Sequence, residues 1–520
     1  MFGARVSHTV EEAEQQYESK SRQLYLGTKM TSVQRSVLFS AADRYGNVVL
    51  FFIATAVLSR LLTPGEFGVY AFVSAVTAVI GASFQEFGGA NYLIQKPELS
   101  RSDVRSAFTV TFGISAAIAV LLFLLAGPLS QLLALEGLKR GIEVSALNFL
   151  LFPFSGTISA LLRRDMKFGA LAVCRLIANA TIAVVSIALG VAGFSYMAPI
   201  WGGVAGNMIL AIMLLVRHRN FGALRPSLLE YREVVGFGLY SSGVSVINTF
   251  YNLAPQLFIA RILDFSSVGL YSRAINLTQV FDRFVAEVLN PVILPAIAAR
   301  RKAGEDLKTV YLEAIELLSV VQWPLLLFVA IMARPIISVW LGETWLEVVP
   351  LVRLLCIANM ALFAGCLSYP VLVAAGSVRN ALISSFIALP PSLLVILCAS
   401  FFNVQAVAAS ALFTLPFQAA VAIFFIGRHI GLRPMDIARV LRKSSFVTAA
   451  TALGVAGCAA LTEAGILTSL AGLVLAFLAA ALCWWLGLLL TGHPLLRQLH
   501  FFAAGLARVA PKLRPSRSAM

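Results

Sequence analysis

Two apolar segments of the chain carry rows of polar side chains at the spacing of a helix. Segment 234–260 holds the row Ser241, Ser245, Asn248, Asn252 and Gln256. Segment 267–297 holds a row of two charged and three amide side chains, Asn276, Gln279, Arg283, Glu287 and Asn290. Steps of three or four residues place each row on one helix face. The first row is also consistent with hydrogen bonds between helices, whereas the charges of the second exclude lipid contact and predict a polar cavity.

Guanidinium groups inside apolar segments indicate an anionic ligand, because arginine stays charged when desolvated and pairs with phosphate through two N–H groups. Arg44 and Arg175 are also close enough to segment ends to reach lipid headgroups instead. Arg283 has the alternative of an ion pair with Asp282 or Glu287. The predicted cavity-lining residues are the arginines and amides Arg44, Asn47, Arg175, Asn248, Asn252, Gln256, Asn276, Gln279, Arg283 and Arg353.

Four carboxylates are candidates for binding a coupling ion: Asp43, Glu86, Asp282 and Glu287. A carboxyl group partly withdrawn from water can exchange a proton near neutral pH or bind Na⁺. Pairing with an arginine of a loop is the alternative for Glu86 and Glu287. Because the chain has no Cys-x-x-Cys pair and its short outer loops hold no cluster of His, Asp and Glu, we expect no catalytic residues, no metal and no cofactor.

The segments that hold these residues predict an all-α polytopic membrane protein. Hydrophobic residues make up 59% of the 520 residues and charged residues 12%, unlike a soluble domain. The apolar segments are long enough for fourteen spans, at 37–59, 67–90, 106–127, 142–163, 168–190, 196–216, 234–260, 267–297, 311–333, 347–373, 380–402, 405–427, 446–464 and 467–490.

The basic residues predict the orientation of the chain. Thirty of the forty Lys and Arg residues are counted with the N-terminal tail and with every second gap between spans after it. Six are counted with the alternate gaps. Loops rich in Lys and Arg remain on the cytoplasmic side, so both termini are expected there. The net charge of +15 follows this alternation, so we expect the lipid bilayer and not nucleic acid as the partner of the basic loops.

An internal repeat at an offset of 201 residues predicts two lobes. Ser59–Leu62 and Phe67–Tyr70 recur as Ala260–Leu263 and Val268–Tyr271. The repeated segments cross in the same direction, which predicts a pseudo-two-fold axis along the membrane normal. The expected divisions are a tail 1–36, an N-lobe 37–216, an inter-lobe loop 217–233, a C-lobe 234–427, a loop with two further helices 428–490, and a tail 491–520.

The motifs resemble those of a known family. The run Leu62–Tyr70, with Glu86–Gly88 and Leu93–Gln95, resembles the first two helices of bacterial polysaccharide-export flippases. These form the Wzx-like family of the superfamily that includes multidrug and toxin extruders and the lipid II flippase. Val268–Tyr271 and the stretch Pro291–Pro295 fit the same pattern.

This resemblance implies translocation of an undecaprenyl-diphosphate-linked oligosaccharide to the outer leaflet of the bacterial plasma membrane, for exopolysaccharide, capsule or O-antigen synthesis. It implies alternating access through a cationic cavity, and a polysaccharide polymerase, a chain-length regulator and H⁺ or Na⁺ as candidate partners. The alternatives are a multidrug extruder of the same superfamily, which would need carboxylates in its cavity, and a membrane-embedded polymerase or glycosyltransferase, which would need catalytic groups on a sizeable loop.

Overall fold

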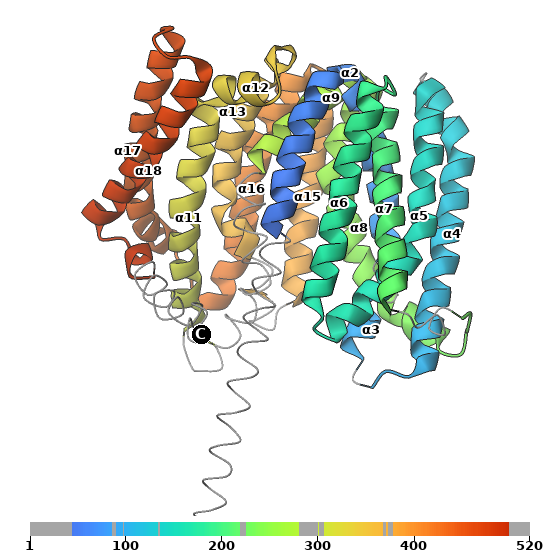
Figure 1. Ribbon diagram of the computed structural model, residues 1–520. Helices are drawn as coiled ribbons and strands as arrows, with labels where there is room; N and C mark the ends of the chain where they lie inside the picture. Colours follow the sequence, from blue (N-terminus) through green and yellow to red (C-terminus); the bar gives the residue numbers. More distant parts are fainter. Residues whose placement is uncertain are drawn as a thin grey trace, which may run out of the picture. The chain divides into compact units, whose positions relative to one another are not determined.

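The computed structural model describes residues 44–85, 90–96, 98–133, 136–218, 225–279, 300, 306–367, 371–372 and 378–498. The regular structure of these residues is helical (Figure 1). Eleven of the described helices are long and apolar enough to cross a membrane. The expected all-α polytopic fold is therefore confirmed, while the number of fourteen spans stays a prediction because several expected spans extend beyond the described residues.

The helices follow the expected apolar segments. They are Arg44–Leu61, α2 (Pro64–Gln85), α3 (Ala90–Gln95), α4 (Arg101–Leu132), α5 (Glu136–Arg164), α6 (Phe168–Val191), α7 (Met197–His218), α8 (Tyr231–Ile262), α9 (Phe265–Thr278), α11 (Leu307–Ile331), α12 (Ala333–Trp340), α13 (Val348–Asn359), α15 (Val378–Ser400), α16 (Val404–Ile430), α17 (Pro434–Glu463) and α18 (Ser469–Thr491). Two 3-10 segments, η3 (Glu343–Trp345) and η4 (Met360–Leu367), flank α13.

The chain divides into two compact units. Unit 1 comprises residues 1–54 and 77–248, and unit 2 comprises residues 55–76 and 249–520. The chain passes from one unit to the other inside the helix Arg44–Leu61, inside α2 and inside α8. These three helices are thus shared between the units. The expected lobes at 37–216 and 234–427 stay a prediction.

Helix α17 begins twelve residues before the expected span at 446. Its first turns carry Arg439, Arg442 and Lys443, which made this stretch resemble a loop. Pro434 occupies the first turn, and the Asp436 carboxylate accepts a hydrogen bond from the backbone N–H of Arg433 at 3.0 Å. Capping of this kind starts a helix whatever its hydropathy, so a count of apolar residues places this helix start too late.

Three further elements were not expected from the sequence. The short helices α3 and α12 lie between apolar spans, and the expected span 347–373 is divided into α13 and the 3-10 segment η4. Short helices are too brief to give a clear periodic signal. Hydropathy alone therefore found the long helices and missed the short ones.

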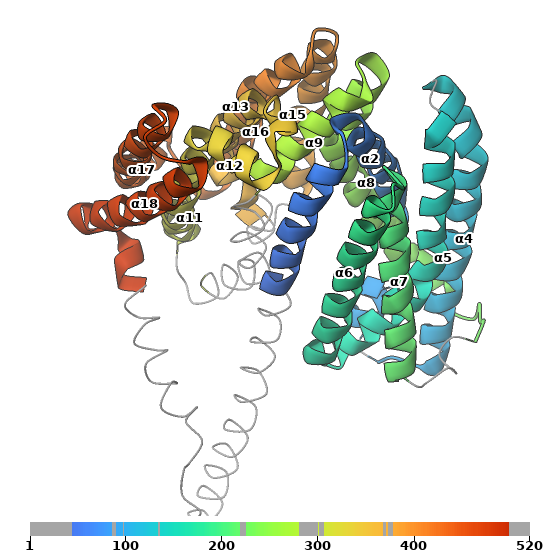
Figure 2. The ribbon, with the colours of Figure 1, turned by 45° about the horizontal axis from the view of Figure 1, so that its top comes forward.

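Unit 1 contains a bundle in which α4 packs on α5, and α7 packs on both α5 and α6 (Figures 1 and 2). The contact of α6 with α7 depends on two glycines of α7. A Cβ atom on Gly202 would lie 2.9 Å from the carbonyl oxygen of Ile182, and one on Gly206 would lie 2.8 Å from that of Ala178. The absence of side chains lets the two backbones approach closely, as is common between membrane helices.

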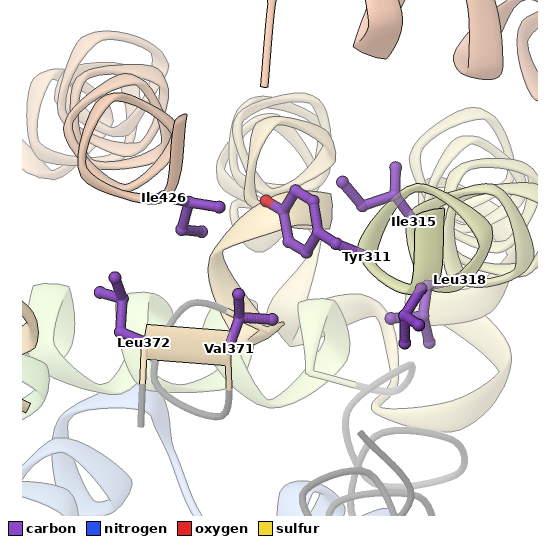
Figure 3. Close-up of a cluster of buried hydrophobic side chains, with 7 residues drawn as sticks. Tyr311, Ile315, Leu318, Val371, Leu372 and Ile426 are labelled. Atoms are coloured by element: carbon purple, nitrogen blue, oxygen red, sulfur yellow. The ribbon is translucent and has the colours of Figure 1, made fainter. Parts of the chain in front are cut away.

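Unit 2 has its own apolar core where α11 meets α16 (Figure 3). The side chains of α11 that enter it include Tyr311 and Ile315, both fully buried. Ile426 of α16 and the pair Val371 and Leu372 complete the cluster. The last two helices, α17 and α18, pack on each other, and α17 also packs on α11. A buried hydroxyl pair, Ser319 Oγ donating to Ser444 Oγ at 2.9 Å, joins α11 to α17.

The α6–α7 contact predicts that a substitution at Gly202 destabilises the protein, whereas the same substitution at the adjacent Gly203 does not. Gly202→Val should lower the free energy of unfolding by about 1–3 kcal/mol, because overpacking forces backbone shifts. Gly203→Val is the matched control, since nothing lies within 4 Å of a Cβ at that position. The measurement is the thermal unfolding midpoint of the detergent-solubilised protein. Equal midpoints for the two variants would contradict the packing described here.

Candidate functional site

Five of the predicted site residues lie outside the described residues. They are Asp43, Glu86, Asp282, Arg283 and Glu287. The backbone of Asn248 belongs to α8, but its side chain is also outside the description. The roles of these residues, which include all four candidates for ion coupling, stay predictions.

Two of the predicted arginines, Arg44 and Arg175, lie on adjacent helices of unit 1. Asn179 Nδ2 donates a hydrogen bond to Asn47 Oδ1 at 2.9 Å, which joins α6 to the helix Arg44–Leu61. A Cβ on Gly46 would lie 3.0 Å from Leu176 Cδ1. Gly46 precedes Asn47 and Leu176 precedes Asn179, so the order of the two contacts is the same along both helices, and the helices run parallel. Arg44 stands one turn before Asn47, and Arg175 one turn before Asn179.

Both arginines therefore lie next to the amide pair and on the side of each helix that faces the other. Both are half-buried. Two guanidinium groups on adjacent helices, beside amides, form an arrangement that suits a group with several negative oxygens, such as a diphosphate. The sequence predicted these residues separately, and the structure places the two helices that carry them against each other at the Asn47–Asn179 hydrogen bond.

The predicted residues of unit 2 differ in burial. Gln256 on α8 is 8% exposed, so in this conformation it is a packing residue. Asn252 on α8, Gln279 after α9 and Arg353 on α13 are exposed, and Asn276 on α9 is half-buried. Helices α9 and α13 pack on each other. Unit 2 therefore keeps most of these polar groups accessible.

A polar network inside unit 2 escaped the sequence analysis. Gln418 Nε2 of α16 donates hydrogen bonds to the hydroxyl of Tyr251 on α8 and to Ser392 Oγ on α15, the latter at 3.2 Å. Gln418 is an isolated polar residue of α16, and Tyr251 lies on α8 beside the polar row but is not one of its members, so the row did not mark this pair. The network joins α8 to the consecutive helices α15 and α16, which lie far from it in sequence.

A charged cluster in unit 1 also escaped the sequence analysis. Lys96 Nζ lies 2.9 Å from Asp103 Oδ1, 2.9 Å from Glu233 Oε2 and 2.8 Å from the Tyr92 hydroxyl. Its four members come from α3, the following residue, and the first turns of α4 and α8. Asp103 is 2% exposed. The cluster therefore fixes the start of α8 to unit 1.

The protonation of this charged cluster is governed by its hydrogen bonds. Its bonds to Tyr92, Asp103 and Glu233 raise the pKa of Lys96, and burial raises the pKa of Tyr92 to about 12. Ligand oxygens of Asp103, Glu230 and Glu233 lie within 4.8 Å of one another, as in a metal site. The ammonium group of Lys96 already occupies the position of a cation between two of these carboxylates.

Arg273 is a further residue that the sequence analysis did not identify. It lies within the expected span 267–297, and the structure places it inside α9. Arg273 is 2% exposed, and its Cζ lies 3.5 Å from the centre of the Phe67 ring. It stands three residues before Asn276, at the spacing of the polar row of segment 267–297, and this spacing could have identified it.

Comparison with known proteins assigns a family and a fold. Residues 57–350 match the family described as polysaccharide biosynthesis protein. The lipopolysaccharide biosynthesis protein WzxC of Escherichia coli (strain K12) is 24% identical over 313 residues, which are 58% of this chain and 62% of the relative. The succinoglycan biosynthesis transport protein ExoT of Rhizobium meliloti (strain 1021) is 25% identical over 340 residues, which are 63% and 66%.

The matches thus cover about two thirds of the length of these relatives. Among solved structures, the lipid II flippase MurJ in an inward closed conformation matches with a TM-score of 0.69 at 12% identity, over 86% of this chain and 98% of that one. The resemblance noted in the sequence is confirmed. The relatives and this neighbour are described as biosynthesis, transport or flippase proteins, in agreement with the expectation of a transporter and not an enzyme.

The charged cluster predicts an effect of Lys96→Met on stability. The variant leaves the buried Asp103 carboxylate without its cationic partner, which is unfavourable. We expect the thermal unfolding midpoint to fall by several degrees. Lys139→Met is the control, because Lys139 is exposed and its Nζ lies 3.9 Å from Glu143, an ion pair that contributes little. A fall of the same size in both variants would contradict the role of the cluster.

The same cluster predicts a dependence on pH. Its hydrogen bond from Lys96 lowers the pKa of Glu233 below the ordinary value of 4.5. A carboxylate with a lowered pKa contributes stability above its unfolded pKa and loses it as the pH falls through the folded value. The unfolding midpoint of the wild-type protein should therefore drop below about pH 4.5. The Lys96→Met variant should drop less over that range, and parallel curves would refute the assignment.

Proposed function

The chain belongs to the family of polysaccharide biosynthesis proteins, and on that premise we propose that it is a flippase for a lipid-linked oligosaccharide. It moves an undecaprenyl-diphosphate-linked repeat unit from the cytoplasmic to the outer leaflet of the bacterial plasma membrane. The family match over residues 57–350 is the observation that carries this proposal. A fold like that of the lipid II flippase MurJ supports it.

The chemistry of unit 1 supports a diphosphate as the group that is recognised. Arg44 and Arg175 lie one turn from the hydrogen-bonded amides Asn47 and Asn179. Guanidinium groups bind phosphate oxygens through paired N–H groups and keep their charge away from water. The amides can bind sugar hydroxyls next to the diphosphate. Arg283 and Arg353 belong to the same proposed pathway.

The transport cycle is proposed to use alternating access, in which the binding groups are offered first to one face of the membrane and then to the other. In the proposed orientation both termini are cytoplasmic. Asp43, Glu86, Asp282 and Glu287 are the proposed sites for H⁺ or Na⁺ coupling. A polysaccharide polymerase and a chain-length regulator are the proposed protein partners.

A host that lacks its own flippase tests the proposal. Expression of this chain should restore surface polysaccharide and remove the lipid-linked repeat units that accumulate at the inner leaflet. Polymer is measured by immunoblot, and accumulated intermediate by extraction and mass spectrometry. Resistance to cationic drugs without restored polymer would support the extruder instead, and turnover of labelled sugar nucleotides by the purified protein would support an enzyme.

Two arginine variants test the binding groups in the same host. Arg44→Gln and Arg175→Gln should each reduce export about tenfold or more, because a charge-assisted hydrogen bond contributes about 1.5–3 kcal/mol. Arg140→Gln is the control, since Arg140 is exposed. Immunoblots must show equal amounts of each variant in the membrane. Normal export by both test variants would remove these arginines from the pathway.

A further inference from the structure

The two copies of the internal repeat meet at a reciprocal glycine contact in unit 2. A Cβ on Gly68 of α2 would lie 1.6 Å from the carbonyl oxygen of Phe265, and one on Gly269 of α9 would lie 2.1 Å from that of Pro64. The repeat offset of 201 relates Gly68 to Gly269 and Pro64 to Phe265. Each copy therefore makes the same contact with the other, and the pseudo-two-fold axis passes between the two glycines.

Arg273 lies beside this glycine contact, covered by two aromatic side chains. Its Cζ lies 3.5 Å from the centre of the Phe67 ring and 5.3 Å from the ring of Trp345. Trp345, in η3, is fully buried, and its Nε1 donates a hydrogen bond to the carbonyl oxygen of Ser59 at 2.7 Å. Arg60 Nη2 donates to the carbonyl oxygen of Val339 at 2.9 Å. The segment that carries Trp345 is thus held to the helix Arg44–Leu61.

Two of the three guanidinium nitrogens of Arg273 are not satisfied in this conformation. Its Nε and Nη2 are buried and have no hydrogen-bond partner within the described part of the chain. Arginine cannot lose its charge to escape this environment. Stacking on aromatic rings offsets only part of the cost of removing a guanidinium from water. An apolar side chain of similar size would pack here at lower cost, so stability does not explain an arginine at this position.

We propose that Arg273, Phe67 and Trp345 form a covered anion site, which binds an oxyanion of the phosphate class when α2 withdraws from α9. The inference rests on the proposed function: the anion is the diphosphate of the lipid-linked substrate. In the proposed orientation α2 and α9 begin at the outer face, so this site holds the headgroup late in transport, before release. Nε and Nη2 then bind two of its oxygens.

The glycine contact makes this exchange reversible. Gly68 and Gly269 approach through backbone atoms, so the side-chain contacts between α2 and α9 that opening must release are the ring contact of Phe72 with Phe265 and the stacking of Phe67 on Arg273. The two aromatic rings move away from Arg273 with the helix and the segment that carry them. The covered state thus hides the charge, and the open state offers it to the substrate.

Fluorescence of Trp345 tests the site without transport. In purified protein whose other five of six tryptophans are replaced by Phe, inorganic pyrophosphate should change the emission of Trp345 in a saturable manner. Arg273→Gln should abolish this change, whereas Arg261→Gln should retain it, because Arg261 is exposed. An unchanged emission on titration of the parent protein, or an equal change with Arg273→Gln, would overturn the inference.

Gly68→Val tests the link between opening and binding. Its side chain cannot coexist with the Phe265 carbonyl oxygen, so α2 and α9 should part and pyrophosphate should bind more tightly, because the competent state is more populated. Gly65→Val is the matched control on the same helix, since nothing lies within 4 Å of a Cβ there. Equal affinities in the two variants would contradict a cover that opens with α2.

Export in the flippase-deficient host separates this inference from the proposed function. Arg273→Gln should lose most export while its unfolding midpoint stays at or above that of the wild type. A purely structural arginine would instead lower the midpoint. Normal export by Arg273→Gln would overturn the covered anion site and leave the proposed function intact. Failure of the wild-type chain to restore export would overturn the proposed function, and the pyrophosphate titration still decides the site.

Discussion

Close approach of helix backbones is the constraint on which the described structure depends. Between membrane helices the hydrophobic effect gives no net attraction, because lipid tails are as apolar as leucine, so helices associate through close packing and a few polar contacts. Glycines supply the close packing here, as Gly202 and Gly206 do between α7 and α6. Gly68 and Gly269 do the same for α2 and α9. Each contact sets the register of one helix on the next.

Polar contacts between helices add direction to this packing. Asn47 pairs with Asn179 in unit 1, and Ser319 pairs with Ser444 in unit 2. In each pair the two side chains are hydrogen-bonded to each other. Arg273 differs, because two of its nitrogens are buried without a hydrogen bond among the described residues. A satisfied pair stabilises one conformation, whereas an unsatisfied charge favours a second conformation in which it finds a partner.

The sharing of helices between the two units bears on how a transport cycle would operate. The helix Arg44–Leu61, α2 and α8 each contribute residues to both units. The described connections between the two units therefore run inside these three helices. The charged cluster of Lys96 ties the start of α8 to unit 1, while the glycine contact ties α2 to α9 within unit 2. These two contacts thus involve different shared helices, α8 in the first case and α2 in the second.

Much of the fold could be predicted from composition and periodicity. Long apolar segments specify membrane helices, because backbone groups in hydrocarbon must be satisfied within the helix. The bounds of α6 agree with the expected span 168–190 to within one residue. The start of α17 could not be predicted in this way, because caps and ion pairs around Asp436 determine it. The interruption of the span 347–373 after α13 likewise has no hydropathy signal.

The candidate site, like the fold, could be predicted from the sequence only in part. By itself the sequence determined which arginines and amides lie inside apolar segments, because burying such groups in a membrane is costly and their presence is informative. Only the tertiary structure decided that the helices of Arg44 and Arg175 meet at the Asn47–Asn179 hydrogen bond, that Lys96 joins three elements, and that Phe67 and Trp345 cover Arg273. These contacts join residues far apart in the chain. Their energies depend on distance and burial, and a linear pattern of residue types contains neither.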